Sequence, residues 1–426
     1  MSEDWVQRIK EIQGCRICGN RALAPVIDLG FQSLAGLFDD GQPYNQLDTP
    51  IPLEVVRCDA TNHPGACGFV QLKHTAPPEV MFRDYGYRSG INATMRRHLQ
   101  DLASQIGSKI SLTKGDIVVD IGANDGTMLL AYPDPEVVRV GFEPSDVRPE
   151  NDHHGIHYIP SFFNRADFHA AFPGKKAKVV TSIAMFYDID DPIHFCQEVS
   201  DILSDDGFWV IELGYLGTLL ENNGFDAICH EHLGYYSLNT LAFLSSKTGF
   251  VFYDISFNQA NGGSVRCTLV KKAGHRDIPR ENQERINLVL GQELERAVHQ
   301  RERYREFQGN VKKIKQDLME LLELALARGE KIYGYGASTK GNVLLQYCGI
   351  SPRHLVAIAD RNPAKWGRRA PGTHIPICSE DQMRQAKPDA LLILPWHFLG
   401  EFLEREKLLR SGGTKFIVPF PKVRLV

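Results

Sequence analysis

Apolar residues predominate in four short blocks between about residues 100 and 275. The blocks cover 117–121, 137–143, 179–187 and 207–215, and more polar segments separate them. Apolar blocks of this length, bounded by turn residues, are typical of buried strands. Because the blocks alternate with helical patterns, the sequence predicts the α/β class with a doubly wound parallel sheet.

The same alternation starts again near the carboxyl end, with apolar blocks at 331–335, 355–360 and 390–395. A long helix is predicted before them, over about 281–328. Its expected buried face consists of residues spaced three or four apart, which are Phe307, Val311, Ile314, Leu318 and Leu322. We therefore expect a linking helix followed by a second Rossmann-like domain.

A glycine-rich turn follows the first apolar block, in the segment DIVVDIGANDGTMLL. Gly122 and Gly126 allow a ligand to approach the backbone, and the helix that follows offers free N–H groups. The spacing differs from the G-x-G-x-x-G of NAD-binding folds and suits S-adenosylmethionine. Asp120 and Asp125 are expected near its methionine end, and Glu143, after the next strand, near its ribose. A turn without a ligand is the alternative.

Two cysteine pairs mark the amino-terminal region. Cys15 and Cys18 have the spacing of a zinc knuckle, and Cys58 and Cys67 are the candidate second pair. Eight residues separate the second pair, so His63, within that insertion, is an alternative ligand. The amino terminus lacks the apolar run of a secretory signal, which favours a metal site over disulfides. We predict one structural zinc, with unbound thiols as the alternative.

The segment DAICHEHLGYYS concentrates ionisable and aromatic side chains, with His230, Glu231 and His232 in succession. Histidine exchanges protons near neutral pH, and an adjacent carboxylate can orient it or stabilise its charged form. A zinc protease motif needs a second histidine four residues after the first, and Gly234 occupies that position. The segment is therefore a candidate for acid–base catalysis, with a polar structural turn as the alternative.

A second glycine-rich turn, GYGASTKGN, matches neither the dinucleotide fingerprint nor a Walker loop. Ser338, Lys340 and Asn342 lie where a strand turns into a helix, so backbone N–H groups and the lysine charge favour an anion. Asp360 closes the next strand, where it is suited to hold a ribose. We predict a pyrophosphate or nucleotide here; a Rossmann-like domain retained only for packing and assembly is the alternative.

The composition excludes several classes of function. The chain has 426 residues, 43% of them hydrophobic, which favours two or three globular domains. The formal net charge of −4 provides no basic field, so nucleic-acid binding is not expected. No apolar segment approaches the ~20 residues needed to cross a bilayer, so we expect a cytoplasmic protein without membrane contact.

Taken in order, the cysteine module, DIGANDG, CHEHLGYYS, Asn261-Gly-Gly-Ser264 and GYGASTKGN resemble the zinc-containing, S-adenosylmethionine-dependent sugar C-methyltransferases. The resemblance covers nearly the whole chain. It implies a zinc-binding module (1–75), a class I methyltransferase domain (76–280) and a linking helix with a second Rossmann-like domain (281–426). It also implies methylation at C3 of a nucleotide-linked 4-keto-6-deoxyhexose, through C3 deprotonation and attack of the enolate on the sulfonium methyl.

The resemblance assigns roles to individual residues. His232 matches the general base and Glu231 its neighbouring acid. Tyr85 or Tyr87 matches an active-site tyrosine, and Tyr87 or His230 would stabilise the enolate oxygen. The residues expected at the cofactor are Tyr85, Asp120, Gly122, Asn124, Asp125, Gly126 and Glu143. Those expected at the substrate are Asn261, Gly262, Ser264, Ser338, Lys340, Asn342 and Asp360.

Two features depart from the family pattern. Some members carry a tyrosine where this chain has Cys229, and the second cysteine pair is stretched. The alternatives are an O-methyltransferase acting on a nucleotide sugar, a nicotinamide-dependent oxidoreductase and a non-catalytic zinc-ribbon scaffold. The missing G-x-G-x-x-G argues against the oxidoreductase, and the His-Glu-His segment beside a cofactor turn argues against the scaffold.

Overall fold

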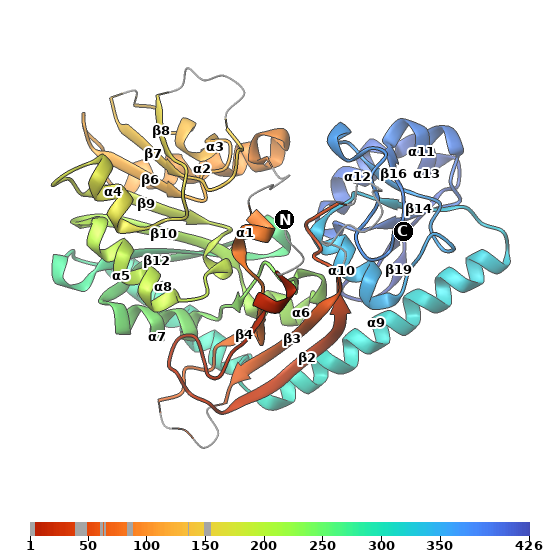
Figure 1. Cartoon of the computed structure of the whole chain (residues 1–426), viewed down its shortest axis with the longest axis horizontal. Helices are drawn as coiled ribbons and strands as arrows, with labels where there is room; N and C mark the ends of the chain where they lie inside the picture. Colours follow the sequence, from red (N-terminus) through yellow and green to blue (C-terminus); the bar gives the residue numbers. More distant parts are fainter. Residues whose placement is uncertain are drawn as a thin grey trace.

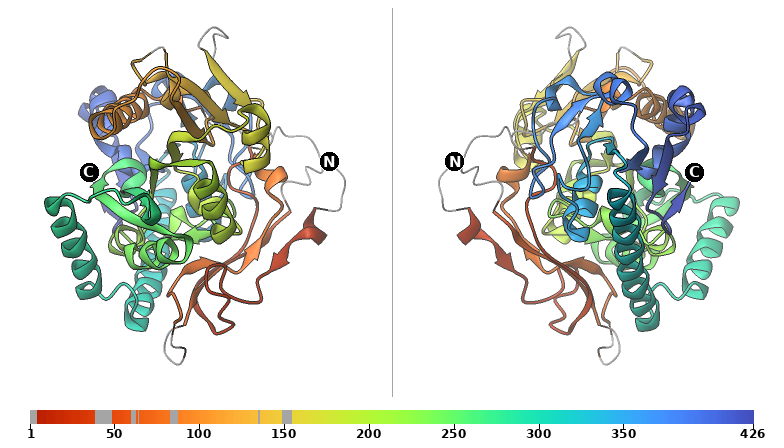
Figure 2. Two further views of the ribbon diagram at one scale, coloured as in Figure 1. Left: turned by 90° about the vertical axis from the view of Figure 1, so that its left-hand side faces the viewer. Right: turned by 90° about the vertical axis from the view of Figure 1, so that its right-hand side faces the viewer.

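The computed structural model describes residues 5–38, 49–59, 63, 65–82, 88–134, 136–148 and 155–426. Three main sheets occupy the amino-terminal, central and carboxy-terminal parts of the chain (Figure 1). The amino-terminal strands lie below the two larger sheets in both views of Figure 2. No helix among the described residues is both long enough and apolar enough to cross a membrane.

The central sheet has seven strands in the order β12-β13-β10-β9-β6-β7-β8. The strands from β10 to β8 are mutually parallel and contain the four apolar blocks. Helices cover both faces, so the doubly wound arrangement is confirmed. The parallel strands are β6 (Ile117–Ile121), β7 (Val138–Phe142), β8 (Ile156–Ile159), β9 (Ala177–Ile183) and β10 (Leu203–Gly214). The helices are α2 (Ala93–Lys109), α3 (Thr127–Leu130), α4 (Arg165–Ala171), α5 (Pro192–Ile202) and α7 (Leu238–Thr248).

The central sheet also has an antiparallel edge, which the sequence did not predict. Strands β12 (Phe250–Asn258) and β13 (Ser264–Lys271) form an antiparallel hairpin that joins the edge of β10. Such a short connection can join only antiparallel strands. Asn261, Gly262 and Gly263 all have positive φ in this turn, which explains its composition.

The carboxy-terminal sheet has the order β16-β15-β14-β17-β18-β19 and is parallel except for its last strand. It confirms the predicted second α/β domain. Its strands are β14 (Ile332–Tyr335), β15 (Ile358–Asp360), β16 (Ile377–Ser379), β17 (Ala390–Ile393), β18 (Lys415–Val418) and β19 (Arg424–Leu425). Its helices are α10 (Thr339–Cys348), α11 (Glu380–Ala386), α12 (Leu399–Arg405) and α13 (Lys407–Ser411).

The linking helix is broken into two. Helix α8 (Arg280–Glu295) ends before a turn in which Ala297 has a φ of 54°, and α9 (Arg301–Ala327) follows. The carboxylate of Glu293 accepts hydrogen bonds from the backbone N–H groups of Leu238 and Asn239, which fixes the end of α8 against α7. The predicted apolar face is buried along α9, from Phe307 to Leu322.

The amino-terminal sheet has the order β11-β4-β3-β2, and its fourth strand comes from a distant part of the chain. Strand β11 (Gly234–Tyr235) directly follows the His-Glu-His segment and pairs with β4 (Val70–Leu72). The other strands are β2 (Leu23–Gln32) and β3 (Ile51–Cys58), and α9 runs along β2 (Figure 1). The zinc module is therefore built partly from the segment that carries the candidate base. The remaining elements are β1 (Lys10–Glu11), β5 (His74–Thr75), α1 (Pro78–Phe82) and α6 (Leu216–Glu221).

Candidate active site

One large cavity, about 1310 Å³ in volume, lies where the three parts of the chain meet. Residues that come directly after β6, β7 and β9 line it on one side. Residues that follow β14, β15 and β17 line it on the other, and Gly36 and Phe38 come from the amino-terminal part. The carboxyl ends of two parallel sheets thus face one space, which is where α/β sheets bind their ligands.

The turn after β6 forms a cradle for a cofactor. Gly122 has a φ of 75° and Asn124 a φ of 51°, so the chain folds back tightly. The Glu143 carboxylate accepts hydrogen bonds from the Asn124 N–H at 2.8 Å and the Ser145 N–H at 2.9 Å, and it lines the cavity. An ionised carboxylate has about four acceptor sites, so Glu143 can still accept from a ribose hydroxyl.

Asp120 lines the same wall and is almost wholly buried. Its carboxylate accepts a hydrogen bond from the Thr181 hydroxyl at 2.6 Å. Burial raises the pKa of Asp120 to about 7. A cationic ligand in the cavity would favour the ionised form of this carboxylate, as expected beside the methionine end of S-adenosylmethionine.

The structure does not bring Asp125 and Gly126 into the cavity wall. The Asp125 carboxylate accepts hydrogen bonds from the Gly90 N–H at 2.7 Å and the Thr127 hydroxyl at 2.6 Å. Gly126 has a φ of 74° at the start of α3. The local sequence pattern identified the turn, but these two residues shape it and hold the neighbouring segment at Gly90.

His232 lines the cavity in a defined orientation. Its Nδ1–H donates a hydrogen bond to the Ala227 carbonyl at 2.8 Å, so Nε2 carries the lone pair. Nε2 has no partner among the described residues, and the Tyr187 ring lies 4.3 Å away, between ring centroids. Burial and the charge of Lys340 lower the pKa of His232 to about 4. The imidazole is therefore neutral at pH 7 and can accept a proton on Nε2.

Glu231 supports the cavity wall beside this base. Its buried carboxylate accepts a hydrogen bond from the Gly36 N–H at 3.0 Å, and burial raises its pKa. A Cβ at position 36 would lie 2.5 Å from the Glu231 Oε1, so a larger residue there would displace the Glu231 carboxylate. The Asp188 carboxylate also lines the cavity, and burial and the Glu231 charge raise its pKa.

The remaining predicted catalytic residues are placed differently. His230 is buried but does not line the cavity, and the backbone carbonyls of Ile51 and Pro52 lie beside its ring. We therefore assign it no contact with substrate. Tyr85 and Tyr87 lie outside the described residues.

The side chain of Lys340 extends from the carboxy-terminal part of the chain to the methyltransferase part. Its ammonium group donates a hydrogen bond to the Asn261 carbonyl in the β12–β13 turn, and desolvation lowers its pKa. Asn261 and Gly262 also line the cavity. Ser264 lies behind them, with its hydroxyl donating to the Ala260 carbonyl at 2.9 Å.

Of the other residues predicted at the second glycine turn, some line the cavity and one is buried away from it. Ser338 lines the cavity and caps α10, with its hydroxyl accepting from the Gly341 N–H at 3.1 Å. Asp360 also lines the cavity and accepts from the Asn362 N–H at 2.8 Å. Asn342 is fully buried and donates to the Ala35 carbonyl at 2.8 Å, so it joins two parts of the chain and does not face a ligand.

Several wall residues were not predicted from the sequence. Tyr187 and Asp188 follow β9, Arg361 follows β15, and His397 follows β17. A usable signal was present, because residues that follow parallel strands gather at one sheet edge.

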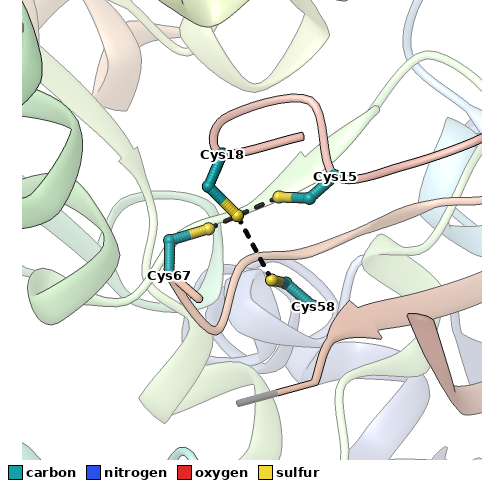
Figure 3. Close-up of side chains that lie close together, drawn as sticks. All are labelled: Cys15, Cys18, Cys58 and Cys67. Carbon is teal, nitrogen blue, oxygen red and sulfur yellow. Dashed lines mark hydrogen bonds between the residues drawn. The ribbon is translucent and has the colours of Figure 1, made fainter. Parts of the chain in front are cut away.

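The four predicted cysteines converge in the amino-terminal part (Figure 3). Their Sγ atoms all lie within 4.8 Å of one another, with 3.4 Å between Cys15 and Cys67 and 3.5 Å between Cys18 and Cys58. A tetrahedral zinc–thiolate site has sulfur–sulfur edges of about 3.8 Å, given a zinc–sulfur bond of ~2.3 Å. The donor set therefore fits one zinc. His63 is exposed and is not part of the cluster.

Arg16, inside the zinc knuckle, connects the metal site to the cavity wall. Its guanidinium donates to the Leu72 carbonyl at 2.5 Å and the Thr75 hydroxyl at 2.7 Å. Its Nε donates to the Asp190 carboxylate at 2.9 Å, two residues beyond Asp188. The knuckle is thus tied to β4, which holds β11, and to the segment after β9.

Comparisons with known proteins agree with this geometry. Three family models match consecutive segments: "Putative zinc binding domain" at 15–82, "Methyltransferase domain" at 91–255 and "C-methyltransferase C-terminal domain" at 259–421. The chain is 30% identical over 420 residues to the C-methyltransferase NovU of Streptomyces niveus, and the alignment covers 98% of each protein.

Solved methyltransferases align with the chain only in part. The plantazolicin methyltransferase BpumL matches with a TM-score of 0.32 and 15% identity, covering 41% of this chain and 83% of its own. The magnesium protoporphyrin IX methyltransferase of Synechocystis PCC 6803 matches with a TM-score of 0.32 and 11% identity, covering 42% of this chain and 88% of its own.

The fold, the cofactor cradle and the three family-model matches define a methyltransferase that uses S-adenosylmethionine and carries a cysteine zinc site. More closely, the chain belongs to the C-methyltransferase family that joins these three domains. The predicted class of enzyme, its fold and its cofactors are confirmed. The oxidoreductase and scaffold alternatives are thereby excluded.

Replacing Glu143 by glutamine is expected to weaken cofactor binding. A hydrogen bond to a charged group contributes about 1.5–3 kcal/mol, which corresponds to a roughly 10- to 150-fold higher dissociation constant. Calorimetric titration with S-adenosylmethionine measures this. Glu136→Gln, an exposed acid paired with Lys114, is the control and should bind normally. Equal affinities of both variants would show that Glu143 does not hold the ribose.

Proposed function

We propose that this enzyme methylates C3 of a nucleotide-linked 4-keto-6-deoxyhexose. The observation that carries the proposal is the neutral imidazole of His232, which lines the same cavity as the cofactor turn and keeps its lone pair on Nε2. Carbon becomes a nucleophile when a neighbouring carbonyl can hold the negative charge. A base beside the methyl donor is what such a substrate needs, and a 4-keto group makes the C3 proton removable.

The part of the cavity wall that comes from the carboxy-terminal domain is suited to bind the diphosphate group of a nucleoside diphosphate sugar. Arg361 and Arg368 both line it, both are exposed, and neither forms an ion pair with a described residue. Guanidinium groups bind phosphate oxygens in pairs, which makes arginine well suited to this position. The cavity volume of about 1310 Å³ also exceeds the ~300–1,000 Å³ of a typical small-ligand site, which leaves room for two ligands.

In the proposed reaction, the residues of the protein remove a proton from the substrate and hold the reactants in position. His232 accepts the C3 proton on Nε2, and the electron pair moves toward C4, whose oxygen takes the negative charge. Asp120 and Glu143 would hold S-adenosylmethionine, which would supply the methyl group for the new bond at C3. His232 then releases its proton to solvent, which restores the neutral base.

Mass spectrometry of a substrate panel tests the proposal. The enzyme is incubated with S-adenosylmethionine and nucleotide-linked 4-keto-6-deoxyhexoses deuterated at C3, with dTDP, GDP and CDP as the nucleotide. C-methylation at C3 adds one methyl group and removes the deuterium. A methylated product that retains the deuterium would identify an O-methyltransferase, and no methylation of any 4-keto sugar would refute the proposal.

A further inference from the structure

Lys340 has a position that its sequence context did not predict. It lies in the first turn of α10, where an anion-binding helix end was expected, yet its ammonium group reaches the Asn261 carbonyl of the methyltransferase part. It is only partly buried, and it lines the cavity. An ammonium group has three donors, so two remain for a ligand after the bond to Asn261.

The charges around Lys340 belong to the reaction centre and not to the nucleotide end. Asp226, Cys229, His232 and His397 are the titratable groups close enough to interact with it. Asp226 is held by a hydrogen bond from the Trp396 indole at 2.9 Å. Its charge offsets part of the cost of desolvating the ammonium group, and the ammonium charge adds to burial in lowering the pKa of His232 and of His397.

Other cations are better placed for a diphosphate. Arg361 and Arg368 are exposed residues of the carboxy-terminal part of the cavity wall, whereas the Lys340 ammonium group contacts the Asn261 carbonyl and is close enough to His232 to lower the pKa of that imidazole. If the diphosphate of the substrate contacts these two arginines, its sugar would lie between the arginines and the His232 imidazole. Lys340 then meets the sugar ring and not the phosphates.

We propose that Lys340 donates a hydrogen bond to the C4 oxygen of the substrate and stabilises the enolate that forms when His232 removes the C3 proton. This inference rests on the proposed function. In the step, the C3–H bond breaks, the proton passes to Nε2 of His232, and the electron pair forms a C3–C4 double bond as the carbonyl oxygen becomes negative. The ammonium charge meets that oxygen, and no oxidant or reductant takes part.

Exchange of the C3 hydrogen in deuterated water isolates this step, because it needs no methyl donor. With dTDP-4-keto-6-deoxyglucose as the probe, Lys340→Met should lower both exchange and methyl transfer by about 10²–10³, the usual loss on removing one oxyanion donor. Lys340→Arg, which keeps the charge, should recover part of the rate. The affinity for dTDP alone should stay unchanged in both variants, whereas an Arg361→Gln/Arg368→Gln double variant should bind dTDP more weakly.

The pH profile distinguishes this role from a merely structural one. Removing the Lys340 charge should raise the pKa of His232, so the acid limb of the exchange profile in Lys340→Met should move to higher pH. Normal exchange in Lys340→Met, or a loss confined to dTDP affinity, would overturn the inference. If Lys340→Met does not fold, Lys340→Arg with wild-type dTDP affinity but no exchange at any pH would overturn it too. Absence of exchange by the wild-type enzyme on every 4-keto sugar of the panel would instead refute the proposed function.

Discussion

Replacing His232 by asparagine is expected to lower methyl transfer by a factor of about 10²–10⁴, the usual contribution of a general base. Asparagine can still donate a hydrogen bond to the Ala227 carbonyl, but it cannot accept the C3 proton. Exchange of the C3 hydrogen in deuterated water should fall by the same factor. The affinity for S-adenosylmethionine should not change, because Asp120 and Glu143, which we expect to hold the cofactor, come from another part of the cavity wall.

His230→Asn is the matched control for this variant. His230 is two residues away and is more deeply buried than His232, but it does not line the cavity. Its replacement should leave exchange per folded molecule near the wild-type rate, whatever it does to stability. Exchange that survives in His232→Asn and disappears in His230→Asn would show that the wrong histidine has been assigned as the base.

The pH dependence of C3 hydrogen exchange in the wild-type enzyme gives a second test of His232. Only the neutral imidazole accepts a proton, and burial lowers its pKa to about 4. Exchange should therefore be independent of pH near neutrality and fall as the pH drops through about 4. In His232→Asn, the exchange rate should be low at every pH, and its fall near pH 4 should be absent.

The parts of the fold that depend on local pattern were predictable. Buried strands, the glycine turn at Gly122 and the paired cysteines each leave a signal within a short window. The acid after β7 could be placed as well, since an adjacent parallel strand ends at the same sheet edge. These features gave the class of fold and both cofactors.

The features that sequence analysis missed all depend on contacts between distant segments. Strand β11 pairs with β4, although more than a hundred and fifty residues separate them in the sequence. A pattern within a short window of the sequence cannot predict such a pairing. Lys340 was assigned to a helix-end anion site because its neighbours in sequence fit one, yet its ammonium group bonds to Asn261. Asp125 was assigned to the cofactor for the same reason and instead binds the Gly90 N–H. A side chain's partner is set by tertiary packing, which local pattern cannot specify.

The pairing of β4 with β11 links the zinc site to the catalytic segment. Gly234 pairs with Gln71 and Tyr235 with Val70, and the Leu72 N–H donates to the Leu233 carbonyl at 2.9 Å. Strand β4 begins shortly after Cys67, and β11 begins two residues after His232. The zinc thus fixes the strand against which the base is held.

Replacing Cys58 by serine is therefore expected to remove the zinc, destabilise the protein strongly and abolish catalysis together. Structural zinc sites contribute about 10–16 kcal/mol of binding free energy in small zinc peptides at neutral pH, so we expect the amino-terminal sheet to unfold without it. Elemental analysis, thermal unfolding and C3 hydrogen exchange measure the three effects. Cofactor affinity should survive, because Asp120 and Glu143 belong to the central sheet.

Cys378→Ser is the control for the zinc variant, since Cys378 lies in β16, outside the cluster. It should keep about one zinc per chain, the wild-type melting temperature and the wild-type exchange rate. A zinc-free Cys58→Ser protein that melts and exchanges like the wild type would show that the metal is dispensable. A variant that keeps its fold and cofactor affinity but loses exchange would localise the effect to β4, β11 and the position of His232.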